Sequence, residues 1–196
     1  MISFITQNQK GAMFGLDARI SMLIFGILSG IAGVGITMTT KDVTAGALTE
    51  ELNQYSKAVE GIHKDLRIDL HTALDSTGTG AADQDAVIAL YDSSVLTNSA
   101  RWLGPYVRTH KTKHSHYGEM LLSKRKIDHT VDCDATDLCY IWLQIADVPI
   151  GVTLDINENF DGNAEATPET LGRLQYTGVG ELVTVWFRIA KALNRN

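Results

Sequence analysis

The sequence predicts an α+β protein in which a long N-terminal α-helix begins in a membrane and ends on an antiparallel sheet. An uncharged apolar run occupies residues 20–38, a helical stripe of apolar residues follows over 48–66, and β-rich segments are confined to the second half of the 196-residue chain. Because helical signals come first and strand signals follow, helix and sheet are expected as separate layers of one domain.

The run at 20–38 has the sequence ISMLIFGILSGIAGVGITM and no charged residue. Its length is close to the roughly 20 residues that cross a hydrocarbon core as a helix. A cleaved secretory signal is the alternative, but its apolar core is usually about 7–15 residues and follows a purely basic start. Here Asp17 and Arg19 precede the run, so a transmembrane helix is predicted. Lys10 and Arg19 favour a cytoplasmic amino terminus and a head outside.

An amphipathic helix is predicted after the span, either continuous with it or joined near Gly46. Apolar residues recur at steps of four and three, and charged and amide residues fill the other face. The apolar face has two possible partners, a second copy in a coiled coil or the chain's own sheet. The sheet is favoured because the downstream strands need a cover. The apolar positions are Leu48, Leu52, Tyr55, Val59, Ile62 and Leu66.

The second half predicts three or four strands, since β-branched and aromatic residues gather between turn residues. Before them, residues 75–85 are predicted as a loop, and Asp85 is predicted to cap a short helix. The predicted strands are 119–127, 140–146, 172–177 and 182–189.

The composition excludes several functions. The net charge of −6 and a pI of about 5.4 make nucleic acid an unexpected partner. The sequence has no nucleophile elbow, P-loop or zinc-protease signature, so no enzymatic activity is predicted.

Cys133 and Cys139 are separated by five residues, a spacing that fits no common zinc or redox pattern. In an exported head they are predicted to form a disulfide, which stabilises such a short loop by about 2 kcal/mol. Two independent buried thiols are the alternative for a cytosolic protein.

The N-terminal sequence KGAMFGLD at 10–17, followed by the apolar helix, resembles the precursors of type IV pilins and type II secretion pseudopilins. The resemblance implies a leader at 1–12 and cleavage between Ala12 and Met13, which makes Asp17 the fifth mature residue. The family usually has Gly before the cut and Glu as the acid. Cleavage after Gly11 or Gly15 is the alternative.

A second resemblance lies at residues 102–106, Trp-Leu-Gly-Pro-Tyr, which look like the Trp-x-Gly-Pro-Tyr element of major pseudopilins. Trp102, Gly104, Pro105 and Tyr106 are interpreted as a motif that packs against the head. The two resemblances imply an assembly helix at 13–38 and an exported head at 39–196 that includes the second half of the long helix.

The resemblance implies a structural subunit that polymerises with copies of itself into a pilus or a secretion pseudopilus. A prepilin peptidase, an assembly ATPase with its membrane platform, and the inner membrane before assembly are the implied partners. The filament is then extracellular or periplasmic. The resemblance also implies that Asp17 pairs with the free amino group of Met13 in a neighbouring subunit. An Asp17–Arg19 pair is the alternative. Gly26 and Gly30 have the spacing that lets helix backbones approach closely.

Two further patterns are interpreted conservatively. Asp155, Asn157, Asn159 and Asp161 alternate as oxygen ligands of a calcium loop do, but an ordinary Asx-rich turn is favoured and no other cofactor is expected. The stretch 110–116 holds three histidines and two lysines, His110, Lys111, Lys113, His114 and His116. A solvated loop is favoured there over a metal or polyanion site.

A membrane-anchored sensor or binding module that does not polymerise is the alternative function. The long helix is then a stalk, and Asp17 never meets a new amino terminus.

Overall fold

The computed structural model describes most of the chain in two compact units, Met1–Val43 and Thr44–Asn196, the second of which is called the head unit below. The described residues are 10–74, 82–133, 138–162 and 170–193, with side chains described at 19–27, at 29 and from 44 onward.

The first unit consists, in its described part, of the beginning of helix α1, Lys10–Leu66. The predicted span at 20–38 lies within α1, but its side chains at 28 and 30–38 lie outside the described set. Among the residues that the structure describes, no helix is long and apolar enough to cross a membrane.

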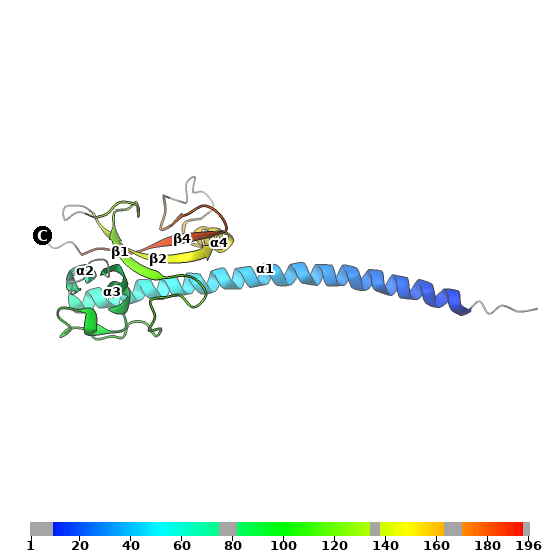
Figure 1. The fold of residues 1–196 in the computed structure, drawn as a ribbon, viewed down its shortest axis with the longest axis horizontal. Helices are drawn as coiled ribbons and strands as arrows, with labels where there is room; N and C mark the ends of the chain where they lie inside the picture. Colours follow the sequence, from blue (N-terminus) through cyan, green and yellow to red (C-terminus); the bar gives the residue numbers. More distant parts are fainter. Residues whose placement is uncertain (1–9, 75–81, 134–137, 163–169, 194–196) are drawn as a thin grey trace, which may run out of the picture. The chain divides into compact units, whose positions relative to one another are not determined.

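The end of α1, from residue 44, covers one face of the sheet in the head unit (Figure 1). All six apolar positions of the predicted stripe are at most 4% exposed and belong to one core with the strands. The Ser56 hydroxyl also donates a hydrogen bond to the carbonyl of Ile189 at 3.3 Å. The prediction that this face packs on the chain's own sheet is therefore confirmed. Gly46 lies inside α1, which the structure shows as one helix.

The sheet has four antiparallel strands in the order β1-β2-β4-β3, which confirms the predicted fold class of the head. Alternate residues of the long central strands β2 and β4 face the core, among them Ile141, Leu143, Val185 and Phe187. The predicted strands agree with the observed ones to within a few residues at each end. The observed strands are β1 Met120–Arg125, β2 Tyr140–Pro149, β3 Leu174–Thr177 and β4 Leu182–Lys191.

Short helices differ most from the sequence prediction. Helix α3, Ala82–Ile88, begins before Asp85, so this aspartate lies inside the helix and the predicted cap is wrong. Residues 75–81 of the predicted loop lie outside the described residues. Helix α4 spans Ile150–Asp161, so the predicted turn is wrong. Thr153, Ile156 and Asn157 recur at helical spacing and are buried on one face of this helix. The remaining short elements are α2 Leu70–Ala73 and the 3₁₀ helix η1 Ser93–Val95.

Candidate assembly site and head surface

The predicted processing and assembly residues lie near the beginning of α1. Ala12, Met13, Asp17 and Gly30 are helical in their backbone. The side chains of Ala12, Met13 and Asp17 lie outside the described set. The amine partner predicted for Asp17 thus remains a prediction.

A continuous apolar surface is exposed on α1 a little further along. Six large apolar side chains between residues 20 and 27 are 50–80% exposed. A Cβ at Gly26 would meet no atom within 4 Å apart from its chain neighbours and the backbone of its own helix. The six are Ile20, Met22, Leu23, Ile24, Phe25 and Ile27.

The Trp-Leu-Gly-Pro-Tyr element joins the end of α1 to the chain that follows α3. The indole N–H of Trp102 donates to the carbonyl of Ala89 at 2.9 Å, and the backbone N–H of Tyr106 donates to the carbonyl of Leu90 at 2.8 Å. The Trp102 and Tyr106 rings meet edge to face at 5.8 Å. A Cβ on Gly104 would stand 2.6 Å from the Trp102 ring, so glycine is required there.

Tyr106 makes the contact with α1 itself. Its hydroxyl donates to Asp65 Oδ2 at 2.6 Å and accepts a hydrogen bond from the backbone N–H of Leu103 at 3.1 Å. Its ring lies 3.1 Å from the Cβ position of Gly61. Burial, followed by the hydrogen bond to Asp65, raises the pKa of Tyr106 to about 12. Gly61 and Asp65 lie four residues apart on one helix face, and no sequence pattern singled them out as partners of Tyr106.

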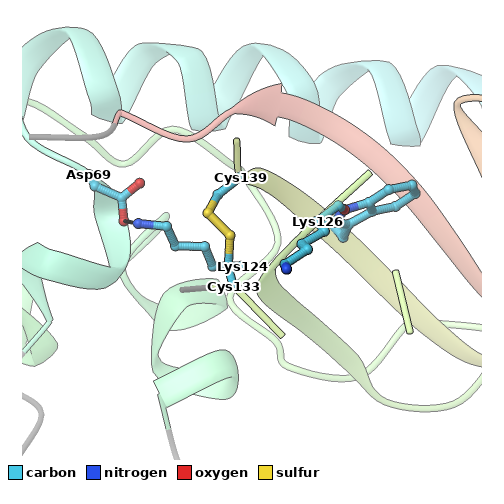
Figure 2. Close-up of a disulfide and its surroundings, with 6 residues drawn as sticks. Asp69, Lys124, Lys126, Cys133 and Cys139 are labelled. Carbon is cyan, nitrogen blue, oxygen red and sulfur yellow. Dashed lines mark hydrogen bonds and ion pairs between the residues drawn. A yellow bond between two sulfur atoms is a disulfide. The ribbon is translucent and has the colours of Figure 1, made fainter. Parts of the chain in front are cut away.

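Cys133 and Cys139 form the expected disulfide, with a Cα–Cα distance of 5.9 Å. It lies beside Lys124 and Lys126, and the Lys124 ammonium reaches Asp69 Oδ1 at 3.5 Å (Figure 2). The bridge closes part of the segment between β1 and β2.

That segment covers the sheet face opposite α1. His129 is 1% exposed, stacks on the Trp186 ring at 4.8 Å and meets the Trp142 ring at 6.0 Å. Its Nδ1 lies 2.6 Å from Gln175 Oε1, which accepts the ring proton because the Gln175 amide nitrogen donates to backbone carbonyls. His129 therefore belongs to a second small core, and no sequence pattern singled it out.

The four residues considered as calcium ligands lie on α4 and not in a loop. The Asn157 amide donates to the carbonyl of Leu174 at 3.0 Å, and the Asp161 carboxylate accepts from the backbone N–H groups of Arg173 and Leu174. These two side chains fix the start of β3 against α4. In the part of the chain that the structure describes, no group of three or more His, Cys, Asp or Glu side chains is arranged to hold a metal ion.

The predicted solvated stretch at 110–116 contains one buried residue. His114 is 7% exposed, stacks on Tyr117 at 4.5 Å, and its Nε2 lies 2.9 Å from Glu51 Oε2. The backbone N–H of His116 donates to His114 Nδ1, which leaves Nε2 to carry the proton toward Glu51. The prediction of a wholly solvated loop is wrong at His114, because this ring ties the loop to α1.

Two adjoining grooves lie between α1 and the loop that follows Tyr106. They share Gln54, Val107 and Arg108 and have volumes of about 460 and 340 Å³.

No family model, curated protein or solved structure matches this chain.

Proposed function

We propose that this protein is a structural subunit of a type IV pilin-like filament, either a pilus or a secretion pseudopilus. As a precursor it is anchored in the cytoplasmic membrane with the head outside, and after processing it polymerises through its N-terminal helix. The observation that carries the proposal is the uncovered apolar surface at 20–27 of α1, in a chain whose head unit has its own complete core.

A large apolar patch that is left exposed marks a surface with a lipid or protein partner. Side chains such as Met22 and Phe25, which are 80% and 74% exposed, contact lipid and then protein in the proposed assembly. Lipid tails cover them before assembly, and helices of neighbouring subunits cover them in the filament. The open surface at Gly26 supports close helix approach, because small residues let backbones pack against each other.

The head supports the proposal by its construction. An α-helix covers a four-stranded antiparallel sheet, and the Trp102–Tyr106 element fastens the loop before the sheet to that helix. A head built in this way keeps its shape when the apolar surface changes from lipid to protein.

In this proposal, Asp17 sets the axial position of each subunit relative to its neighbours in the filament. A carboxylate at the edge of the hydrocarbon is costly, roughly 2.5–3.5 kcal/mol at mid-span, and the cost falls when a cation pairs with it. The amino group that cleavage creates on Met13 of a neighbouring subunit is that cation. Pairing favours one axial position of each subunit along the filament.

Mass spectrometry of the native protein tests the processing step. Intact mass and N-terminal peptides are measured in sheared surface material and in membranes, and a chain that begins at Met13 with one added methyl group is expected. An uncut chain confined to membranes contradicts the proposal and favours the membrane-anchored binding module.

A matched pair of variants tests the role of Asp17. Asp17→Ala is expected to remove filaments from the sheared fraction while the subunit stays in the membrane. Asp17→Glu keeps the carboxylate and is expected to assemble. Equal assembly of both variants and wild type contradicts the pairing with the amino group.

A further inference from the structure

We propose that the head unit binds single-stranded nucleic acid along the groove between α1 and the loop at 106–115. The site is a property of the head alone, so it goes beyond the proposed filament and does not depend on it. It also departs from the expectation drawn from the net charge of −6, because the fold gathers cations that the average conceals.

The lining of the groove is cationic. Among the described residues that line it are four cations and one carboxylate, and all four cations are exposed. The carboxylate, Glu51, is held by the ring of His114 at 2.9 Å. The cations are Lys57, Arg108, Lys111 and Lys113.

These cations are available to a ligand. Within the described part of the chain, Lys57, Arg108 and Lys111 have no carboxylate within the 4.0 Å of an ion pair. Lys113 is expected to contribute less to anion binding than the other three cations. Its backbone pairs with that of Glu119, which brings a carboxylate close to it. About three phosphate contacts are therefore expected.

The shape favours an extended ligand over a single small anion. The two grooves meet at Gln54 and Arg108, and together they follow α1 from Ala47 to Ala58. At about 1.5 Å per residue this path is about 16 Å long. A row of phosphates fits such a path better than one isolated group does.

Aromatic rings beside the cations favour nucleic acid over an acidic peptide. His110 lies between Thr109 and Lys111, which line the groove, and its exposed ring stacks on Tyr91 at 5.1 Å with an interplanar angle of 13°. Tyr106 lines the groove as well. A basic groove for the backbone, together with aromatic surfaces for the bases, is how proteins bind single strands without reading their sequence.

Fluorescence anisotropy with the full chain in detergent and a labelled mixed-sequence DNA single strand tests this inference. Three phosphate contacts predict a slope of about −2 for log affinity against log salt, and thus about a 20-fold loss of affinity between 50 and 200 mM salt. The variant Lys57→Gln/Arg108→Gln/Lys111→Gln is expected to abolish most of this dependence. Its matched control, Lys64→Gln/Arg101→Gln/Lys191→Gln, removes the same number of exposed cations outside the groove and is expected to bind with nearly the wild-type salt slope.

Two further measurements separate the competing ligands. His110→Ala is expected to weaken DNA binding about fivefold or more at an unchanged salt slope, and to leave binding of inorganic polyphosphate unaltered. Polyphosphate that binds as tightly as DNA at equal charge overturns the assignment to nucleic acid. Equal losses in the groove variant and the control variant overturn the site.

Sedimentation of the same proteins without DNA covers the remaining possibility. If the groove variants lose self-association while DNA binding is unchanged, a second copy of the chain occupies the groove, and the inference is wrong. All variants concern exposed side chains, and tryptophan fluorescence checks that the head is folded. Filament formation is scored separately, so failure of this site and failure of the filament proposal are distinguishable.

Discussion

Two parts of the same helix have opposite surroundings. Between residues 48 and 66 of α1, six apolar side chains are at most 4% exposed, whereas six between 20 and 27 are 50–80% exposed. In the later part, charged residues separate the apolar ones into a stripe, and in the earlier part apolar residues occupy all sides.

This contrast indicates where each part of α1 finds its partner. A stripe on one face is matched by one apolar surface, which the chain's own sheet supplies. A helix that is apolar all round is instead typical of an element surrounded by apolar material. For residues 20–27 the described chain supplies no such cover, so the cover is expected from lipid or from other copies.

The largest expected effect comes from truncation of a covered position. Leu52 is fully buried, and Leu52→Ala is expected to lower the free energy of unfolding of the head by about 3 kcal/mol, through lost burial and the cavity left behind. Leu23→Ala, at a position 66% exposed, is the control and is expected to change it by less than about 0.5 kcal/mol. Urea unfolding followed by tryptophan fluorescence measures both, since the three tryptophans lie in the head unit.

A similar cost for Leu23→Ala contradicts the contrast between the two parts of α1, because it means that the first unit contributes to the stability of the head.

The next effect concerns two glycines. Gly104→Ala places a Cβ against Trp102 and Tyr106 at 2.6–2.9 Å, and it is expected to destabilise the head by about 2 kcal/mol. Gly46→Ala, in α1 with open space around it, is expected to stabilise by about 0.5–1 kcal/mol, since alanine favours helix more than glycine does. Thermal unfolding compares the two. A stabilising Gly104→Ala contradicts the tight packing of the Trp-Leu-Gly-Pro-Tyr element.

The hydroxyl of Tyr106 is expected to contribute less. Tyr106→Phe removes the hydrogen bonds to Asp65 and from Leu103, at a cost of about 1 kcal/mol. Because the pKa of Tyr106 is raised to about 12, the folded chain keeps the proton where the unfolded chain loses it. The stability that this proton contributes is present below about pH 10 and is lost as pH rises toward 12.

Unfolding measured from pH 8 to 11.5 checks this alkaline loss, which is expected to be smaller in Tyr106→Phe. An identical pH dependence in the variant and the wild type contradicts the assignment to Tyr106.

The smallest effect is expected from His63, on the covered part of α1. Burial lowers the pKa of His63 below 6.5, against the opposing influence of Asp69; His71 and Lys124 lower it further. Since the unfolded chain takes up the proton first, stability is present above about pH 6.5 and is lost as pH falls below it. Protonation of Nε2 also ends its acceptance of the Leu70 N–H, at 3.3 Å.

Unfolding midpoints at pH 7.5 and 5.5 measure this acid loss. His63→Gln is expected to reduce the loss, while His116→Gln, an exposed histidine, leaves it unchanged. If both variants lose stability with acid as the wild type does, another group carries the effect.

Regular elements of the head were predictable because their signals are local. Leu48, Leu52 and their successors mark one helix face, and the strand segments show the alternation and branching that sheets favour. Helix α4 was missed because the alternating Asp and Asn residues favoured an Asx-rich turn. In the fold, Asn157 and Asp161 instead hold the start of β3.

In the candidate sites, too, local patterns were predictable and long-range contacts were not. The apolar run and the Trp102–Tyr106 element were visible as sequence patterns. The partners of these patterns were not visible, since Tyr106 contacts Asp65 across 41 residues of sequence and His114 contacts Glu51 across 63. Contacts at such separation depend on how the chain returns to the helix, which no local pattern specifies.

Local patterns in the sequence were enough to predict an α+β head and the apolar character of the early helix. Periodicity and spacing carry this information because they act over a few neighbouring residues. The disulfide was predicted from the expectation of an exported head. The tertiary structure was needed to show that the amphipathic helix face meets its own sheet, that His129 stacks on Trp186 and meets Trp142 edge to face, and that Lys57 and Lys111 line adjoining grooves. These features could not be predicted from local sequence, because burial and clustered charge arise from segments that are far apart in the chain and that only folding brings together.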